Sequence, residues 1–157
     1  MVNFNLIIPA VKTSEKSKFP YTKREGDACM DCYASKEVTI PGFKPLEGLG
    51  RAMVPLGFKM KLPEGWEAQV RPRSGMAIND GLTILNTPGT VDENYTGEVC
   101  AIVLNTTAKD YIVKEGDRIC QLAIRPTGLL NTEVVFKEVE ELEETNRGEA
   151  GFGSSGK

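Results

Sequence analysis

Short runs of apolar and β-branched residues recur along the 157-residue chain, and glycine, proline and polar turn residues separate them. Runs of this kind predict short β-strands. We expect strands over residues 3–11, 37–40, 52–62, 66–71, 82–85, 99–104, 111–113, 118–124 and 132–139. Many short strands with little helix between them are typical of an all-β fold, an antiparallel sandwich or barrel.

One segment, residues 74–81, is predicted to form a short helix. Pro72 precedes it, Ser74 is a suitable N-cap and Gly81 is a suitable end. The start of a helix presents free N–H groups and a positive dipole end, so Arg73 and Ser74 there are typical of a phosphate-binding turn. A capped helix beside a surface arginine explains the same residues equally well.

Residues 86–98 separate two predicted apolar strands and are expected to form a hairpin-like excursion. They carry an amide, a carboxylate and a phenol at Asn86, Asp92 and Tyr95. An amide can read the edge of a base, a carboxylate can take a proton from water, and a tyrosine ring can pack against a sugar. Turn formation alone also favours Asn, Asp and Gly, so an ordinary polar turn is the alternative.

Composition and net charge narrow the chemistry that the chain can perform. It has no histidine, so a general base would have to be a carboxylate or, less readily, Lys, Tyr or Cys. The formal net charge of −3 gives no support for nucleic-acid binding but leaves a small phosphorylated ligand open. No apolar run approaches the ~18 residues of a membrane span, and the first residues do not form a signal peptide. A cytoplasmic protein without membrane contact is therefore expected.

The four cysteines are expected to be reduced thiols, because no export signal is present. Cys29 and Cys32 form a single C-x-x-C pair, whereas a zinc site would need a second pair or a histidine. Small, buried side chains are the expected role of these residues.

Residues 116–122 begin as a turn and continue as a strand. Arg118 and Gln121 fall on opposite faces of this strand if it is regular. A turn with a structural pair between Asp117 and Arg118 is the competing interpretation.

The segment 151–157 is rich in glycine and serine. It does not follow a strand and open a helix, so it is not a nucleotide-binding glycine loop of that type. Together with Arg147, it can close over a ligand, with its N–H groups meeting phosphate and the Phe152 ring stacking on a base. A disordered tail is the alternative.

Five stretches, in this order along the chain, resemble the five motifs of the homotrimeric dUTP diphosphatases, or dUTPases. They are residues 27–34, 72–77, 89–98, 116–122 and 147–156. The resemblance implies a jelly-roll β-domain over residues 1–140, followed by a linker and a flexible C-terminal arm over residues 141–157 that closes over the active site. It also implies a homotrimer in which each active site is assembled from three chains.

The reaction that the resemblance implies is the hydrolysis of dUTP to dUMP and pyrophosphate, with Mg²⁺ on the triphosphate. This reaction keeps uracil out of DNA and supplies dUMP for thymidylate synthesis. Asp92 matches the aspartate that activates the water attacking the α-phosphorus. Tyr95 matches the residue that packs under deoxyribose, and Asn86 matches the amide that reads uracil, helped by backbone groups near Cys100.

The remaining implied roles concern phosphate, metal and arm contacts. Asp31 matches a carboxylate that reaches magnesium through water. Phosphate contacts are implied for Arg73, Ser74, Gly75 and Gln121. In the arm, Phe152 would stack on uracil, and further contacts are implied for Arg147, Gly153, Ser154 and Ser155.

The sequence departs from the family pattern at a few positions. Cys29 and Ala150 stand where the family usually has glycine, Cys32 stands for a leucine, and the loop at 41–50 is longer than usual. Two alternative functions remain open. One is a dCTP deaminase of the same fold, and the other is a nucleotide-gated regulatory binding protein that would use the 41–50 loop.

Overall fold

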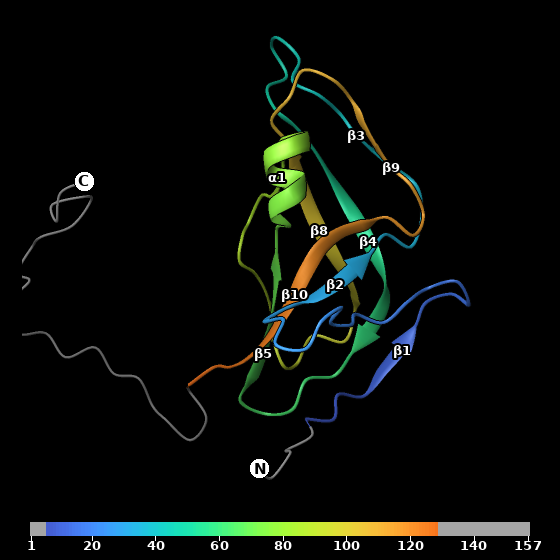
Figure 1. Cartoon of the computed structure of the whole chain (residues 1–157), viewed down its shortest axis with the longest axis vertical. Coiled ribbons are helices and arrows are strands. Elements are labelled where there is room, and N and C mark those ends of the chain that lie inside the picture. Colours follow the sequence, from blue (N-terminus) through green and yellow to red (C-terminus); the bar gives the residue numbers. More distant parts are fainter. Residues whose placement is uncertain (1–5, 129–157) are drawn as a thin grey trace, which may run out of the picture.

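The computed structural model describes residues 6–128, and residues 1–5 and 129–157 lie outside the described part. The predicted strand at 132–139 and all predicted arm residues fall outside it. Within residues 6–128 the chain forms ten strands and one helix (Figure 1). These are β1 (Ala10–Lys12), β2 (Met30–Tyr33), β3 (Val38–Ile40), β4 (Gly50–Met60), β5 (Trp66–Arg71), α1 (Ser74–Asp80), β6 (Leu82–Ile84), β7 (Gly89–Val91), β8 (Glu98–Asn105), β9 (Tyr111–Val113) and β10 (Arg118–Pro126).

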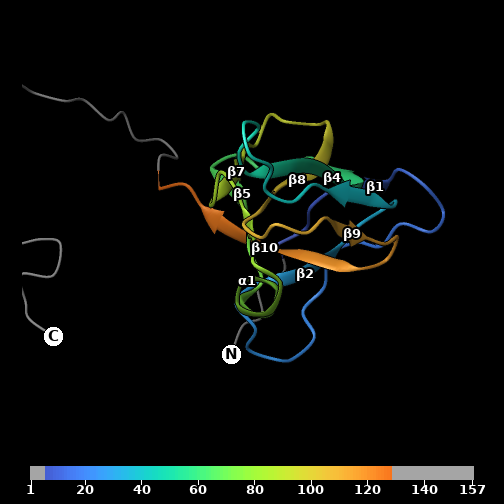
Figure 2. The same ribbon diagram turned by 90° about the horizontal axis from the view of Figure 1, so that it is seen from above.

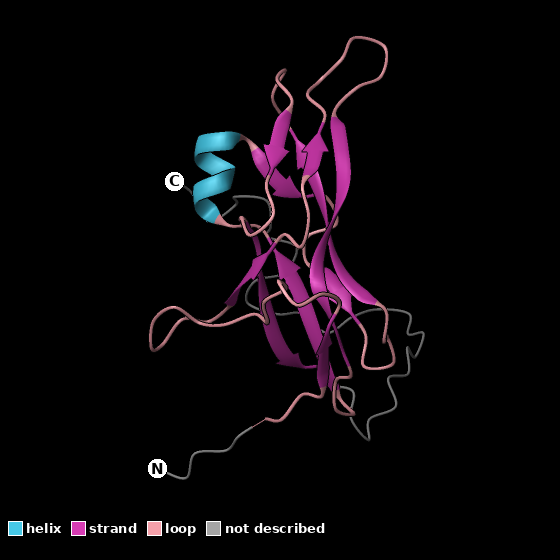
Figure 3. Ribbon diagram, turned by 90° about the vertical axis from the view of Figure 1, so that its right-hand side faces the viewer, coloured by secondary structure: helices cyan, strands magenta, loops and turns pink. Residues whose placement is uncertain are grey.

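Two four-stranded antiparallel sheets face each other, as the view from above in Figure 2 shows. One sheet has the strand order β1-β4-β8-β6 and the other has the order β2-β10-β5-β7, while β3 pairs with β9. Figure 3 shows the helix beside the strands rather than between them. The predicted fold class, a jelly-roll-like antiparallel β-sandwich with one short helix, is confirmed.

The core lies between the sheets and follows the two-residue alternation of the strands. In β8, Val99, Ala101 and Val103 are buried, whereas Ile102 faces outward. Phe58 on β4 is 2% exposed, and burying a side chain of this size contributes about 1.5–3 kcal/mol. The strand expected at 99–104 from its run of apolar residues is confirmed, because it lies within β8.

One predicted strand differs from the structure, and two strands of the structure were not predicted. The strand expected at 3–11 begins only at Ala10, and all three residues of β1 are exposed at the edge of the sheet. Two short strands, β2 and β7, were not predicted as strands. β2 contains the polar Asp31, and β7 begins at a glycine in a turn-like sequence, so neither shows the apolar run that predicts a strand.

The N-cap of the helix lies one residue earlier than predicted. Arg73 rather than Ser74 is the N-cap, and it makes no side-chain capping hydrogen bond. The Arg73 carbonyl accepts the Ala77 N–H at 3.0 Å, so Ser74 is already the first helical residue. The predicted end is confirmed, because Gly81 has a φ of 65°, a left-handed conformation that glycine adopts without a Cβ penalty.

The four cysteines are free thiols. Cys32 and Cys120 are fully buried, as expected of small core residues, while Cys29 and Cys100 are half-buried. In the described part of the chain, no helix has the length and apolar character needed to cross a membrane.

Candidate active site

Asp31, on β2, is the centre of a charged cluster formed by three motif segments. Arg118 Nη1 donates to Asp31 Oδ2 at 3.0 Å, and Gln121 Nε2 donates to Oδ1 at 3.4 Å. Arg73 Nε lies 3.4 Å from the same Oδ1 atom, and the Asp31 side chain is only 12% exposed. The structure therefore brings together three of the predicted phosphate and metal residues, Asp31, Arg73 and Gln121, and adds Arg118 to them.

A β-bulge places Arg118 and Gln121 around the same carboxylate. The register between β10 and β2 shifts between Arg118 and Cys120, and one additional residue, the buried Ile119, occupies the shift. Such a residue reverses the alternation of side chains along the strand. The expectation that Arg118 and Gln121 lie on opposite faces assumed a regular strand and is wrong, because both side chains donate to Asp31.

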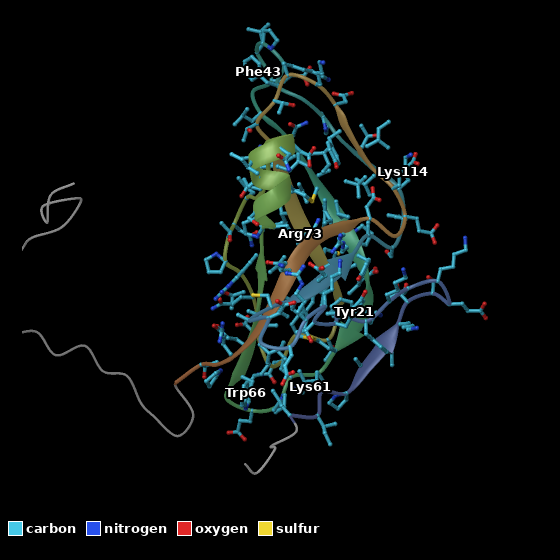
Figure 4. The ribbon with its side chains drawn as sticks, viewed as in Figure 1. Tyr21, Phe43, Lys61, Trp66, Arg73 and Lys114 are labelled. Carbon is cyan, nitrogen blue, oxygen red and sulfur yellow. The ribbon has the colours of Figure 1, made fainter. Side chains whose placement is uncertain are left out.

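Backbone contacts fix the position of this cluster. Arg73 Nη1 also donates to the Arg118 carbonyl at 2.9 Å, which joins the start of the helix to β10. The Asp31 N–H donates to the Tyr21 carbonyl at 3.0 Å, which joins β2 to the preceding segment. Figure 4 shows Arg73 and Tyr21 on the part of the molecule formed by β2 and β10. The competing interpretation, a structural pair between Asp117 and Arg118, is not what forms, because Arg118 pairs with Asp31.

The electrostatics of the cluster keep Arg118 charged and Tyr33 neutral. The hydrogen bond to Asp31, reinforced by the charge of the carboxylate, raises the pKa of Arg118. Burial, followed by the neighbouring Tyr21 hydroxyl, raises the pKa of Tyr33 to about 12. At neutral pH the cluster therefore presents a charged guanidinium at Arg118 and an uncharged phenol at Tyr33, a suitable lining for an anionic ligand.

The first residues of the helix, Ser74 and Gly75, lie at the surface. Both are exposed to solvent, and a Cβ at Gly75 would meet nothing within 4 Å. Among the described residues, therefore, no packing constraint requires glycine at this position.

The 86–98 excursion forms a second group of candidate residues. Its flanking strands pair as predicted, with Leu82 opposite Asn105 and Ile84 opposite Val103. Asn86, Asp92 and Tyr95 are all exposed to solvent.

Two glycines shape the excursion around these side chains. A Cβ at Gly89 would lie 3.3 Å from the Asn86 side chain, and one at Gly97 would lie 2.5 Å from the Tyr95 hydroxyl. That hydroxyl donates to the Glu98 carbonyl at 2.9 Å, so the Tyr95 ring folds back across Gly97. The two glycines therefore give the amide and the phenol room to lie against the backbone.

Further contacts anchor the turn that follows Asp92. Lys61 Nζ donates to the Glu93 carbonyl at 2.9 Å, and the Glu93 carboxylate accepts the Gly65 N–H at 2.6 Å. The Cys100 thiol, on β8, donates to the Glu98 carbonyl at 3.7 Å. Burial, followed by the charge of Glu98, raises the pKa of Cys100, so this residue is a neutral thiol at neutral pH.

Within residues 6–128, the Asp31 cluster and the 86–98 excursion lie apart. In the sheet order β2-β10-β5-β7, Asp31 lies on the first strand and Asp92 directly follows the last. Three strand spacings separate them by roughly 14 Å. Figure 4 agrees, because Lys61, which contacts the Asp92 turn, lies at the lower end of the molecule and Arg73 lies near its middle.

Similarity to known proteins identifies the family of the chain. Residues 15–156 match the model of the dUTPase family. The chain belongs to the dUTPase family. A deoxyuridine 5'-triphosphate nucleotidohydrolase of Clostridium novyi (strain NT) is 48% identical over 145 residues, which cover 92% of this chain and 95% of the relative. The resemblance inferred from the five ordered motifs is confirmed at the level of the family.

Solved dUTPase structures share the fold. A mutant dUTPase of Staphylococcus bacteriophage 80alpha with dUpNHpp is 23% identical, with a TM-score of 0.77 over 97% of this chain and 99% of that chain. A mutant dUTPase from phage phi11 of S. aureus, described as coordinating a structural Mg(II) ion, is 19% identical. Its TM-score is 0.66 over 89% of this chain and 99% of that chain.

The residue of the dUTPase cluster that sequence reasoning missed is Arg118. The signal that could have found it is its place three residues before Gln121, within the fourth motif. The bulge that turns it toward Asp31 leaves no mark in the pattern of apolar and polar residues, because both Ile119 and Cys120 are apolar and buried.

Proposed function

We propose that this dUTPase hydrolyses dUTP to dUMP and pyrophosphate by attack of water on the α-phosphorus. The observation that carries this proposal is the 86–98 excursion, which presents an amide, a carboxylate and a phenol together to solvent. In the attack, the water oxygen bonds to the α-phosphorus and the bond to the bridging oxygen of the β-phosphate breaks. Pyrophosphate leaves, and the proton of the water passes to Asp92.

Asp92 is suited to the role of general base. It is exposed, and within residues 6–128 no hydrogen bond or ion pair engages its carboxylate. A positioned base of this kind contributes typically about 10²–10⁴ in rate. Asn86 would read uracil through its amide and Tyr95 would fill the space beside C2′ of the sugar, which supports a preference for deoxyribose over ribose.

The Asp31 cluster would hold the phosphate end of the nucleotide. Arg73 and Gln121 would donate to phosphate oxygens, with Ser74 and Gly75 at the start of the helix beside them. A guanidinium and an amide are strong donors to such oxygens, particularly where the acceptor is charged. Their present partner, Asp31, shows that both side chains already point to one place.

The Asp31 carboxylate fits a water-mediated contact with Mg²⁺. This ion prefers oxygen ligands, keeps several waters and usually needs only one or two carboxylates beside substrate phosphates. In the described part of the chain no three potential ligands gather, so Asp31 would act together with the phosphates. When bound, Mg²⁺ would neutralise charge on the triphosphate.

We further propose that the active protein is a homotrimer. The separation of Asp31 from Asp92 supports this, because a neighbouring chain can supply the missing half of the site. The outer face of the β4–β8–β6 sheet also presents apolar side chains, since Met53 lies opposite Ile102 and Leu85 pairs with the same strand. Exposed apolar residues gathered in one place mark an association surface. The arm, with Arg147 and Phe152, would come from the third chain.

The experiment that tests the function is pyrophosphate release from dUTP beside dTTP, dCTP and UTP, first with magnesium and then with EDTA. Fast release from dUTP alone, abolished by EDTA, supports the reaction, the base selection at Asn86 and the sugar selection at Tyr95. Ammonia release from dCTP would instead indicate the deaminase alternative. We expect the enzyme to act in the cytoplasm, which a fluorescent fusion would test.

A second candidate, nucleotide-gated binding of a protein partner, is favoured by the 41–50 loop. Phe43, Leu46 and Leu49 are exposed there, and Figure 4 shows Phe43 at the top of the molecule. The base of the loop is held by the Gly42 N–H, which donates to Asp110 Oδ1 at 2.9 Å. Capture of a partner by the nucleotide-bound protein, with no turnover of dUTP, would favour this function over hydrolysis.

A further inference from the structure

The segment that precedes β2 is fastened to the Asp31 cluster, although it belongs to none of the five motifs. Tyr21 forms an isolated bridge with Asp31, and its ring stacks on Tyr33 with centroids 5.9 Å apart and an interplanar angle of 15°. Lys18 Nζ lies over the Tyr33 ring, 5.0 Å from its centroid. A segment that the sequence predicts to be only polar and turn-like therefore has a fixed place beside the candidate active site.

This segment forms one wall of a cavity of about 510 Å³. Four cationic side chains line the cavity, two from the segment and two from the cluster: Lys18, Lys23, Arg73 and Arg118. The phenols of Tyr21, Tyr33 and Tyr111 also face it. The cavity is therefore continuous with the residues that would hold phosphate.

The acidic residues of the cavity do not cancel these cations. Two carboxylates, Asp80 and Asp117, line it as well. The Asp117 carboxylate accepts the backbone N–H of Lys114 at 2.9 Å, so it is engaged in the turn before β10. Asp31 pairs with Arg73 and Arg118, so four cations stand against three carboxylates. An excess of positive charge remains, carried by Lys18 and Lys23, and a concave site concentrates the resulting field.

We propose that Lys18 and Lys23 bind the outer phosphates of the nucleotide, and pyrophosphate after the reaction, in this cavity. The inference rests on the proposed function and extends the phosphate-binding residues beyond the five motifs. Arg73 connects the two parts, because it contacts Asp31 and also lines the cavity. The α-phosphate would lie toward the Asp31 cluster and the outer phosphates toward the lysines. The ligand chemistry is that of a condensed phosphate, either attached to the nucleotide or free.

The test is a calorimetric titration of the full-length protein with inorganic pyrophosphate, with and without Mg²⁺, beside a titration with dUMP. The doubly substituted Lys18→Gln/Lys23→Gln variant should bind pyrophosphate about tenfold more weakly or worse, because each lysine supplies a charge-assisted contact. Its affinity for dUMP, which has no outer phosphates, should be unchanged. A non-hydrolysable dUTP analogue should lose affinity as pyrophosphate does if the cavity holds the nucleotide's own phosphates.

Lys16→Gln is the matched control. Lys16 belongs to the same segment and is 80% exposed, but it pairs with Glu115 at 3.7 Å and does not line the cavity. Unchanged pyrophosphate affinity in the double variant would overturn the inference, as would an equal loss in Lys16→Gln. Because the titration needs no turnover, an inactive protein whose pyrophosphate binding depends on Lys18 and Lys23 would overturn the proposed function alone. Equal melting temperatures of the three proteins would show that the fold is intact.

Discussion

Arg118 Nη1 lies 3.0 Å from Asp31 Oδ2, although the two residues are 87 positions apart in the sequence. This contact crosses from β10 to β2 and joins the first and fourth motifs of the family. Arg73, from the second motif, approaches the other oxygen of the same carboxylate. One carboxylate thus holds three motif segments together and positions the proposed phosphate-binding donors around one point.

Removing the Arg118 guanidinium should loosen this arrangement. Arg118→Gln leaves Asp31 with Arg73 and Gln121 only, so we expect the free energy of unfolding to fall by about 1 kcal/mol, as for a partly exposed ion pair. We expect the KM for dUTP to rise as well. Urea denaturation and steady-state kinetics measure the two effects. Arg125→Gln, at the exposed end of the same strand, should change neither, and equal effects in both variants would contradict the prediction.

Removing the Asp92 carboxylate should affect chemistry and not binding. Asp92→Asn should lower kcat by about 10²–10⁴ while the affinity for a non-hydrolysable dUTP analogue remains, because the amide cannot accept the proton from water. Single-turnover kinetics and calorimetry separate the two quantities. Glu64→Gln removes an exposed carboxylate from a nearby turn and should be fully active. Turnover near the wild-type value in Asp92→Asn would refute its role as the base.

Adding a methyl group at Gly97 should displace Tyr95. The new Cβ would lie 2.5 Å from the Tyr95 hydroxyl and 2.7 Å from the ring carbon that carries it, so the ring must move. We expect Gly97→Ala to keep its fold but to lose discrimination against UTP, because the space beside C2′ would no longer be filled. The ratio of kcat/KM for dUTP and UTP measures this. A ratio equal to that of the wild type would show that the ring position does not select the sugar.

A charge on the outer face of the β4–β8–β6 sheet should prevent assembly. Met53 is 65% exposed and lies opposite Ile102, so Met53→Glu would bury a carboxylate in the proposed interface. Light scattering should give three times the 17.2 kDa chain mass for the wild type and a single chain for the variant, which should also be inactive. Lys59→Glu, on the same strand, should leave the mass unchanged. A trimeric and active Met53→Glu variant would place the interface elsewhere.

The elevated pKa of Tyr33 makes stability depend on pH in the alkaline range. An unfolded tyrosine loses its proton near pH 10, whereas burial raises the pKa of Tyr33 in the folded protein to about 12. Between these values the folded state binds more protons than the unfolded state, so the free energy of unfolding falls as the pH rises. The stabilisation is complete below about pH 10 and is lost as the pH passes about 12.

Melting temperatures measured across this range should fall more steeply for the wild type than for Tyr33→Phe, which cannot titrate at this position. Phe43→Leu, which replaces an exposed ring that does not titrate, serves as the control and should retain the wild-type slope. Parallel curves for Tyr33→Phe and the wild type would show that the Tyr33 phenol is not responsible.

Strands with a clear apolar pattern could be predicted from the sequence, whereas features that depend on strand pairing could not. The predictions at 66–71 and 111–113 have the bounds of β5 and β9. β2 was missed because its short run contains Asp31, whose polar side chain pairs only with residues far along the chain.

The same distinction holds for the candidate site. The ordered motifs predicted that Asp31, Arg73 and Gln121 act at one place, and the structure gathers them. The distance from Asp31 to Asp92 could not be predicted, because it depends on two intervening strands that come from different parts of the sequence.

The bulge at Ile119 makes the site depend on the length of the chain as well as on its residue types. With the bulge kept, one residue inserted between Ile119 and Gln121 would reverse the alternation again and put Gln121 on the face opposite Arg118. Every residue that contacts Asp31 would still be present in such a protein. Substitutions along this strand therefore report on individual contacts, whereas insertions and deletions report on the spacing that allows those contacts to form together.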